Sequence, residues 1–228
     1  MYKICLVEDE EALANIVKLY LERAGYETIC FTKGKDAIDY IGNEVNLWIL
    51  DIMLGDDVNG YDVIKAIRQE DEDVPVIFTS ARDQELDKIF GLELGSDDYM
   101  TKPYSSKELV LRVNNIIKRV YKDSAQPNSL INYDNYIINL DKRIVELNNK
   151  EIKLTTLEFD LLVLFIKNKG KCFSREEILS GVWGDDYFGN DRAVDDLVRR
   201  VRKKLSKLKI EAVYGYGYRL SWVSVKII

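Results

Sequence analysis

Two stretches decide the fold of the first half of this chain: residues 3–10, KICLVEDE, and residues 47–51, LWILD. Each is a short apolar run that ends directly in carboxylates, Glu8 and Asp9 in the first and Asp51 in the second. Short apolar runs bounded by polar residues are typical of buried parallel strands. If the two strands are neighbours in one sheet, the three carboxylates lie together at its carboxyl edge, where such sheets bind ligands.

Further apolar runs alternate with amphipathic stretches through residues 1–120. The five strands are expected at residues 3–7, 27–31, 47–50, 74–78 and 98–100. Between them, apolar residues recur at helical spacing, beginning with the stretch that stops at Gly25. This alternation predicts an α/β doubly wound, five-stranded parallel sheet of the flavodoxin type.

The second half differs from the first in charge and in pattern. Residues 1–122 hold 24 acidic and 15 basic side chains, a net charge of −9, whereas residues 123–228 hold 15 acidic and 18 basic ones, a net charge of +3. Strands are expected at residues 131–154. Three helices are expected at residues 156–167, 175–182 and 192–207, followed by a hairpin at 213–222. We therefore predict a domain at residues 1–121, a polar linker at 122–130 and an α+β domain at 131–228.

The composition excludes several classes of protein. No apolar run approaches the ~18–20 residues that a membrane-spanning helix needs, so we expect no membrane association. The first residues, MYKICLV, run directly into acids, so no secretory signal is expected. Cys5, Cys30 and Cys172 are odd in number and far apart, which argues against a disulfide framework and fits a cytoplasmic location. Because the chain has no histidine, a Ser-His-Asp triad and a phosphohistidine are excluded.

The expected carboxylate cluster has a definite chemistry. Three carboxylates repel one another unless a hard cation with oxygen ligands neutralises them, and Mg²⁺ is the expected cation. Lys102 adds a positive charge after the last strand, and Ser80 adds a hydroxyl after the fourth. Such a group suits an aspartate nucleophile, a metal ion and a cation that steers a phosphoryl group. Acids after strands are also common in ordinary loops, so these residues alone leave both interpretations open.

The order of these residues resembles the receiver domain of bacterial response regulators. The matching motifs are an acidic pair, a phosphoacceptor aspartate, a hydroxyl before alanine and Lys-Pro, here Glu8-Asp9, Asp51, Ser80-Ala81 and Lys102-Pro103. Residues 95–103, GSDDYMTKP, also resemble this family. The resemblance implies that Asp51 accepts a phosphoryl group from a histidine kinase. It also implies that the chain is not an enzyme beyond self-catalysed phosphorylation and dephosphorylation.

The resemblance assigns a role to each side chain around Asp51. It implies that Asp9, Asp51 and the carbonyl of Met53 hold Mg²⁺, with Glu8 contributing through water. It implies that Lys102 pairs with the phosphoryl group. Ser80 would move to hydrogen-bond that group, and Tyr99 would turn inward behind Ser80.

One branch of the family, the OmpR/PhoB type, forms a symmetric homodimer on phosphorylation through charged residues of its fourth helix, fifth strand and fifth helix. A charged helix face is usually only solvated, because exposed ion pairs contribute ~0–1 kcal/mol. The resemblance nevertheless implies intermolecular pairs between Lys88 and Glu108, and between Asp97 or Asp98 and Arg112 or Arg119.

The expected helix at residues 192–207 carries an unbalanced positive charge. Residues 192–209 contain eight basic and two acidic side chains, a net charge of +6. Its outward face is expected to carry Asp196, Arg199, Arg200, Lys203 and Lys207. The face could simply be solubilising, but unbalanced charge favours a polyanionic partner, and double-stranded DNA is the natural one. Together with the helices before it and the hairpin after it, this helix predicts a winged helix-turn-helix.

The second half also resembles the OmpR/PhoB effector domain, in residues 154–162 (LTTLEFDLL), 174–179 (SREEIL) and 215–220 (GYGYRL). The resemblance implies a loop at residues 183–191 that faces RNA polymerase. It implies DNA contacts by seven residues: Arg192, Asp195, Arg199, Arg200, Arg202, Lys203 and Tyr214. Leu197 stands where the family usually has histidine, and Tyr214 where it commonly has arginine. Whether this wing reads the minor groove therefore stays open.

Three functions fit these observations. We favour a two-component response regulator, in which phosphorylation of Asp51 drives dimerisation and the dimer binds tandem DNA half-sites to regulate transcription. A phosphohydrolase of the haloacid-dehalogenase type would need a second aspartate two residues after the nucleophile, where Met53 stands. A regulator that binds DNA without phosphorylation is the third, and the intact set of Asp9, Asp51 and Lys102 argues against it.

Overall fold

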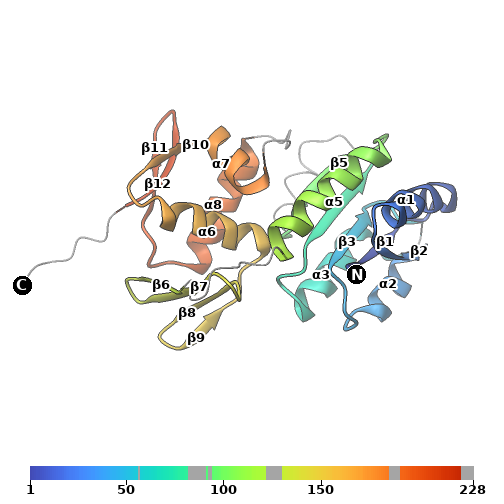
Figure 1. Ribbon diagram of the computed structural model, residues 1–228, viewed down its shortest axis with the longest axis horizontal. Helices are drawn as coiled ribbons and strands as arrows, with labels where there is room; N and C mark the ends of the chain where they lie inside the picture. Colours follow the sequence, from blue (N-terminus) through green and yellow to red (C-terminus); the bar gives the residue numbers. More distant parts are fainter. Residues whose placement is uncertain (56, 82–90, 92–93, 122–129, 185–190, 222–228) are drawn as a thin grey trace, which may run out of the picture. The chain divides into compact units, whose positions relative to one another are not determined.

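The computed structural model describes residues 1–228 except 56, 82–90, 92–93, 122–129, 185–190 and 222–228. The chain divides into two compact units, Met1–Lys122 and Asp123–Ile228, both drawn in Figure 1. Apart from Leu130, the linker expected at residues 122–130 lies outside the described residues.

The first unit contains the expected parallel sheet. Its strands pair in the order β2-β1-β3-β4-β5, and every pair is parallel. Their bounds are β1 Lys3–Val7, β2 Glu27–Phe31, β3 Leu47–Asp51, β4 Val76–Ser80 and β5 Asp98–Thr101. β4 begins two residues later than expected, because Pro75 has no backbone N–H to donate to a strand ladder. It also ends two residues later than expected, so Thr79 and Ser80 are the last residues of this strand.

Two apolar clusters cover the two faces of this sheet. One cluster joins alternate strand residues such as Leu6 and Ile77 to α1 (Glu11–Arg23) and α5 (Ser106–Tyr121). The other joins the intervening residues, such as Val7 and Phe78, to α3 (Gly60–Glu70), beside which lies α2 (Gly34–Tyr40). Because successive side chains of a strand point to opposite faces, near-continuous apolar runs fill both clusters. The described helices lie on both sides of the sheet in Figure 1, as in doubly wound folds.

The second unit combines two antiparallel sheets with three helices. The first sheet has the order β6-β7-β8-β9, with β6 Leu130–Tyr133, β7 Tyr136–Asn139, β8 Ile144–Leu147 and β9 Lys150–Ile152. The second has the order β10-β12-β11, with β10 Cys172–Ser174, β11 Ile210–Val213 and β12 Gly217–Leu220. The helices are α6 Thr156–Lys167, α7 Arg175–Trp183 and α8 Arg192–Lys204. Helix α8 is followed by the β11–β12 hairpin, which is the arrangement of a winged helix-turn-helix.

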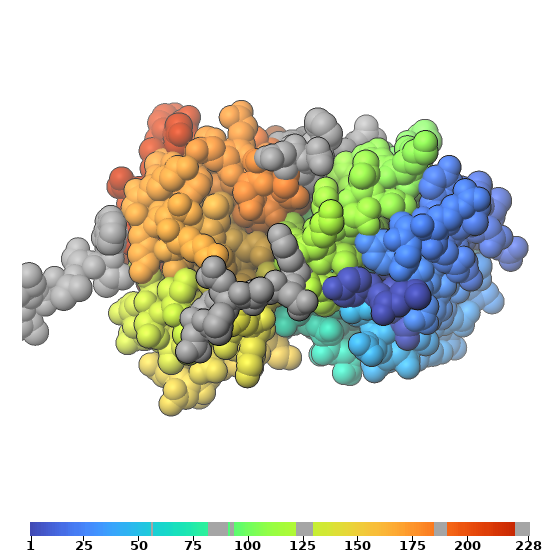
Figure 2. Space-filling view, viewed as in Figure 1, coloured from blue at the N-terminus to red at the C-terminus, as the bar shows by residue number. Residues whose placement is uncertain are grey.

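Helix α8 is shorter than its charge pattern suggested. It ends at Lys204 and not at residue 207, because Leu205 leaves the helical conformation and is fully buried. Leu208 then donates its backbone N–H to the Leu205 carbonyl, which turns the chain toward β11. The hairpin that follows protrudes at the surface of this unit, where it is coloured red in Figure 2.

Candidate functional site

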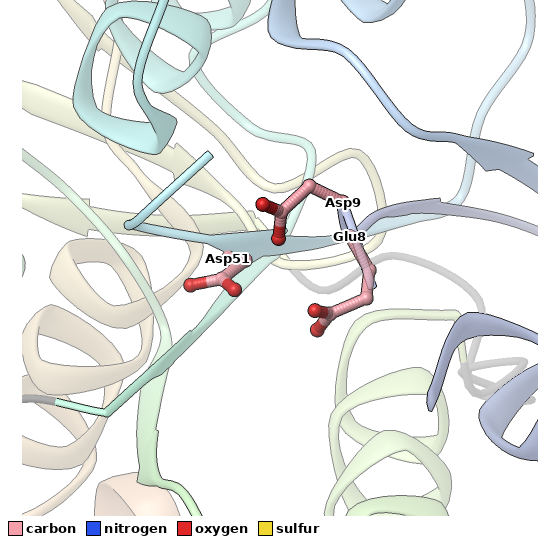
Figure 3. A group of neighbouring side chains, drawn as sticks. All are labelled: Glu8, Asp9 and Asp51. Atoms are coloured by element: carbon pink, nitrogen blue, oxygen red, sulfur yellow. The ribbon is translucent and has the colours of Figure 1, made fainter. Parts of the chain in front are cut away.

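The carboxyl edge of the first sheet brings three carboxylates together. Glu8 and Asp9 follow β1, Asp51 ends β3, and the two strands are parallel neighbours. One ligand oxygen from each residue lies within 4.8 Å of the others, and Figure 3 shows the three side chains beside one another. Glu8 is 0% and Asp51 3% exposed, whereas Asp9 is open to solvent. The structure therefore confirms the predicted acidic cluster of Glu8, Asp9 and Asp51.

Lys102 provides the cation of this cluster. Its Nζ donates to Glu8 Oε1 at 2.7 Å and to Asp51 Oδ2 at 2.5 Å. Burial raises the pKa of Glu8, and the Lys102 hydrogen bond opposes that rise. Burial would lower the pKa of Lys102, but its hydrogen bonds to Asp51 and Glu8 outweigh burial and raise it. Lys102 therefore stays an ammonium group at neutral pH and partly neutralises the two buried carboxylates.

The chain around Asp51 fixes its carboxylate among the possible ligands of a divalent cation. The backbone N–H of Met53 donates to Asp51 Oδ1 at 2.9 Å, which orients the carboxylate. A Cβ at Gly60 would clash with the Asp51 carbonyl, so glycine is required for α3 to begin directly behind this residue. The three carboxylates offer oxygen ligands, which Mg²⁺ and Ca²⁺ prefer. Glu8, Asp9 and Asp51 therefore fit a hard divalent cation.

Ser80 and Tyr99 lie on the same face of the sheet. Ser80 follows Phe78 on that face, and Phe78 is the register partner of Tyr99 in β5. Both are buried, Ser80 with 0% and Tyr99 with 9% exposure. Thr79 faces the opposite side, as the alternation along the strand predicts.

The charged residues assigned to a dimer interface pair within one chain in this structure. Arg112 lies 2.8 Å from Asp98 and 2.8 Å from Glu108, and Arg119 lies 3.4 Å from Asp97. Burial raises the pKa of Asp98, although the positive charge of Arg112 opposes the rise. Any intermolecular pair must consequently replace an intramolecular one. Lys88, the remaining residue of this set, lies outside the described residues.

Helix α8 presents a basic face to solvent, but Arg200 is not part of it. Its side chain is only 11% exposed and lies 3.9 Å from Glu158 of α6, with which Lys204 also pairs at 2.9 Å. The expectation of an outward-facing Arg200 is therefore wrong. Residue 200 stands at the edge of the buried stripe, and the buried carboxylate of Glu158 attracts its guanidinium inward.

Asp195 and Arg202 also make contacts within this unit. Asp195 Oδ1 accepts hydrogen bonds of 2.8 Å from Arg175 Nε and of 2.8 Å from the Tyr218 hydroxyl, which connect α8 to α7 and β12. The Arg202 guanidinium donates to the Ile210 carbonyl at 2.7 Å. The sequence reasoning missed these structural roles, because a charge on a basic helix gives no sign of a partner on another element.

The solvent-exposed residues of the predicted DNA-binding set are then fewer than expected. Arg192, Arg199, Arg202 and Lys203 are exposed on α8, although Arg199 pairs with Asp196 at 3.2 Å and Arg202 donates to the Ile210 carbonyl. Tyr214 is fully exposed in the turn between β11 and β12. Because Arg202 is held by the Ile210 carbonyl, we give the name outer basic face and wing tip to the other four: Arg192, Arg199, Lys203 and Tyr214.

Comparisons with known proteins now decide the family. Residues 4–114 match the family described as "Response regulator receiver domain", and residues 149–220 match "Transcriptional regulatory protein, C terminal". Over 221 residues the chain is 50% identical to the transcriptional regulatory protein CssR of Bacillus subtilis (strain 168), which covers 96% of this chain and 98% of CssR. This chain belongs to the OmpR/PhoB-type response regulators.

Two further relatives of this response regulator agree. It is 37% identical to the response regulator SaeR of Staphylococcus aureus (strain USA300) over 224 residues, which cover 96% of this chain and 98% of SaeR. The crystal structure of DrrB, an OmpR/PhoB homologue of Thermotoga maritima, matches with 27% identity and a TM-score of 0.53, covering 97% of this chain and all of that one. The chain is thus a two-component response regulator with a receiver and a DNA-binding half. Among its described helices, none is long and apolar enough to cross a membrane.

Proposed function

We propose that Asp51 accepts a phosphoryl group from a histidine kinase, with Mg²⁺ held beside it, and that phosphorylation promotes dimerisation and sequence-specific DNA binding. The observation that carries this proposal is the cluster of Glu8, Asp9 and Asp51 with the Lys102 ammonium 2.5 Å from Asp51. A buried carboxylate next to a cation site is a suitable nucleophile for phosphoryl transfer.

Each residue of the site then has a defined task. Mg²⁺ would be held by Asp9, Asp51 and the Met53 carbonyl, with Glu8 acting through water, and would neutralise charge on the phosphoryl oxygens. The Met53 N–H holds Asp51 Oδ1, so that Oδ2 is directed at Lys102. Lys102 would keep its ammonium near the transferred group and pair with a phosphoryl oxygen. The Ser80 hydroxyl would donate a hydrogen bond to the same group, with Tyr99 turned inward behind it.

The second half of the chain would bind DNA and so regulate transcription. The outer basic face and wing tip would contact a DNA half-site, and a homodimer would occupy two of them. In the dimer, Arg112 and Arg119 would leave Asp98 and Asp97 of their own chain and pair with acidic residues of the second chain. Residues 183–191 would contact RNA polymerase, although most of this loop lies outside the described residues. A cytoplasmic location is consistent with cysteines that are all free.

Labelling by a small phosphodonor tests the proposed chemistry. We expect acetyl phosphate to add one phosphoryl group per chain when Mg²⁺ is present and none when a chelator removes it. Labelling that proceeds equally well in the chelator would contradict the metal assignment. A chain that is never labelled would support the regulator that acts without phosphorylation.

Lys203→Ala tests the DNA-binding face. The exposed Lys203 ammonium is expected to contact phosphate only, so the variant should bind specific and scrambled duplexes more weakly to the same degree. The slope of log affinity against log salt should fall in magnitude by about one. Binding titrations at several salt concentrations measure both, and Lys150→Ala, which removes an exposed lysine of β9, is the control. An unchanged salt slope for Lys203→Ala would place this lysine outside the interface.

A further inference from the structure

A cavity of about 270 Å³ opens at the amino edge of the receiver sheet, the edge opposite to the acidic cluster. Helices α2 and α3, which lie side by side in Figure 1, end at its walls: Ile41 directly follows α2, and Glu70 is the last residue of α3. From the sheet it is lined by Trp48, near the start of β3, and by Val74, just before β4. The proposed function gives this cavity no task.

The inner wall of the cavity is apolar. Trp48 is 2%, Ile67 1% and Val74 5% exposed, and the half-buried Ile41 and Val45 continue this wall. The volume is close to the lower limit of about 300 Å³ for ligand pockets and equals that of roughly nine water molecules. Because apolar walls offer water no hydrogen bonds, an apolar group of that size would displace the water favourably.

The rim of the cavity carries charge of one sign. Its charged lining residues are Glu70 and Asp71, and the described lining includes no lysine or arginine. These two begin a run of four acids, EDED at residues 70–73, at the carboxyl end of α3. The helix dipole makes acids unfavourable there and cations favourable. Among the described residues, Glu70 has no hydrogen bond or ion pair that offsets this cost, and such local conflicts are typical of functional sites.

The loop that holds these acids is fixed before any ligand arrives. Asp71 Oδ1 accepts the backbone N–H groups of Asp73 at 2.8 Å and of Val74 at 3.0 Å. The Arg68 guanidinium donates to the Val74 carbonyl at 2.7 Å and lies 3.9 Å from the buried Asp97 carboxylate. The positive charge of Arg68 is therefore engaged by Asp97, and the Asp71 carboxylate is held at the rim.

We propose that this cavity binds a small organic cation. Its apolar body lies against Trp48 and Ile67, and its ammonium group lies beside the carboxylates of Glu70 and Asp71. Tryptophan is also the aromatic side chain that attracts organic cations most strongly. An inorganic cation would gain nothing from the apolar wall, and an anion would be repelled by the rim. The site does not depend on the proposed phosphorylation, because none of its residues belongs to the acidic cluster.

Titration of the ¹⁵N-labelled full chain with 2-phenylethylammonium, at constant ionic strength, tests the site by NMR. The chain has three tryptophans, so the indole N–H signal of Trp48 can be assigned with Trp48→Phe, and Trp183 of the second unit is the internal control. We expect the Trp48 signal to shift with a Kd on the order of 1 mM, as suits a ligand of this size. An unshifted Trp48 signal at ~20 mM amine would overturn the site.

Two probes of matching shape test the selectivity for a cation. The neutral 2-phenylethanol should bind about fivefold more weakly than the amine, which is the upper end for a solvent-exposed charge pair, and phenylacetate should leave the Trp48 signal unshifted. Equal affinities of the amine and the alcohol would overturn the assignment of a cationic ligand.

Glu70→Gln and Asp71→Asn each remove one charge and keep the shape of the side chain. Each should weaken binding of the amine about two- to threefold and leave binding of the alcohol unchanged. Asp71→Asn also keeps an oxygen for the N–H groups of Asp73 and Val74. Asp39→Asn, which removes an exposed acid of α2 that does not line the cavity, is the matched control. Wild-type affinity for the amine in both lining variants would overturn the role of the carboxylates.

Val45→Phe tests whether the probes occupy the cavity itself. The larger side chain at this lining position should fill the space and abolish the Trp48 shift with both the amine and the alcohol. Amine binding to a folded Val45→Phe chain with wild-type affinity would place the ligand elsewhere and overturn the proposal.

Discussion

Replacing Asp51 by asparagine is expected to abolish phosphorylation of this response regulator. The amide has the shape of the carboxylate but no anionic oxygen, so both the nucleophile and one expected Mg²⁺ ligand are lost. Labelling by acetyl phosphate should fall by at least ~10³-fold, as the removal of a covalent nucleophile commonly does. The ion pair with Lys102 is lost as well, but the Met53 N–H can still donate to the amide oxygen.

The matched control for this experiment is Asp57→Asn, which removes an exposed acid of the loop after β3. We expect the control to be labelled like the wild-type chain. Measuring the phosphoryl content of the intact chain, followed by mapping of the modified peptide, distinguishes the two. Wild-type labelling of the Asp51→Asn chain would mean that another residue is the phosphoacceptor.

Glu158→Ala is expected to be the most damaging single change in the DNA-binding half. The Glu158 side chain is 2% exposed, accepts the Thr155 N–H at 2.9 Å and pairs with Lys204 at 2.9 Å. Its removal takes away the carboxylate that lies 3.9 Å from the guanidinium of Arg200, which is 11% exposed. Breaking a buried ion pair by removing one partner typically costs about 3–5 kcal/mol, and we expect a loss of about 3 kcal/mol because Lys204 can turn to solvent.

Urea unfolding followed by hydrogen exchange in peptides of α6 and α8 measures this loss. Glu151→Ala, which removes an exposed acid of β9, should change the free energy of unfolding by less than about 0.5 kcal/mol. The double variant Glu158→Ala/Arg200→Ala should regain part of the loss, because the Arg200 guanidinium is removed together with the carboxylate beside it. Equal stability of Glu158→Ala and the wild-type chain would contradict the role of this pair.

The receiver half could be predicted well from sequence because its signals are local. Apolar runs that end in Glu8-Asp9 and Asp51 define both the strands and the edge at which they meet. The alternation of side chains along a strand is also sufficient to place Thr79 and Ser80 on opposite faces of the sheet. The strand bounds were less accurate at β4, where the missing N–H of Pro75 delays pairing to Val76.

The DNA-binding helix shows what sequence patterns could not supply. Helical periodicity identifies the buried stripe of α8, but a long side chain at its edge can turn to either side. For Arg200 the direction is decided by Glu158 on another helix, and for Asp195 by Arg175 and Tyr218. These partners are distant in sequence and become visible only in the folded chain.

The contact between Thr79 and Tyr104 was equally hidden. Thr79 lies in an apolar run and Tyr104 near the start of a helix, so each has the sequence context of an ordinary core residue. Only the folded chain brings the Tyr104 hydroxyl to that of Thr79 and within electrostatic reach of Glu8. No spacing in the sequence indicates that contact.

The affinity of the full chain for DNA, measured with and without phosphorylation, tests the central claim most directly. A duplex selected from a random library would serve as the site, with acetyl phosphate and Mg²⁺ as the phosphodonor mixture. We predict that the donor tightens binding of the wild-type chain by at least about tenfold, within the usual range of coupling between two sites, and leaves Asp51→Asn unchanged. Equal affinity of the wild-type chain in both conditions, despite complete phosphorylation, would contradict the account.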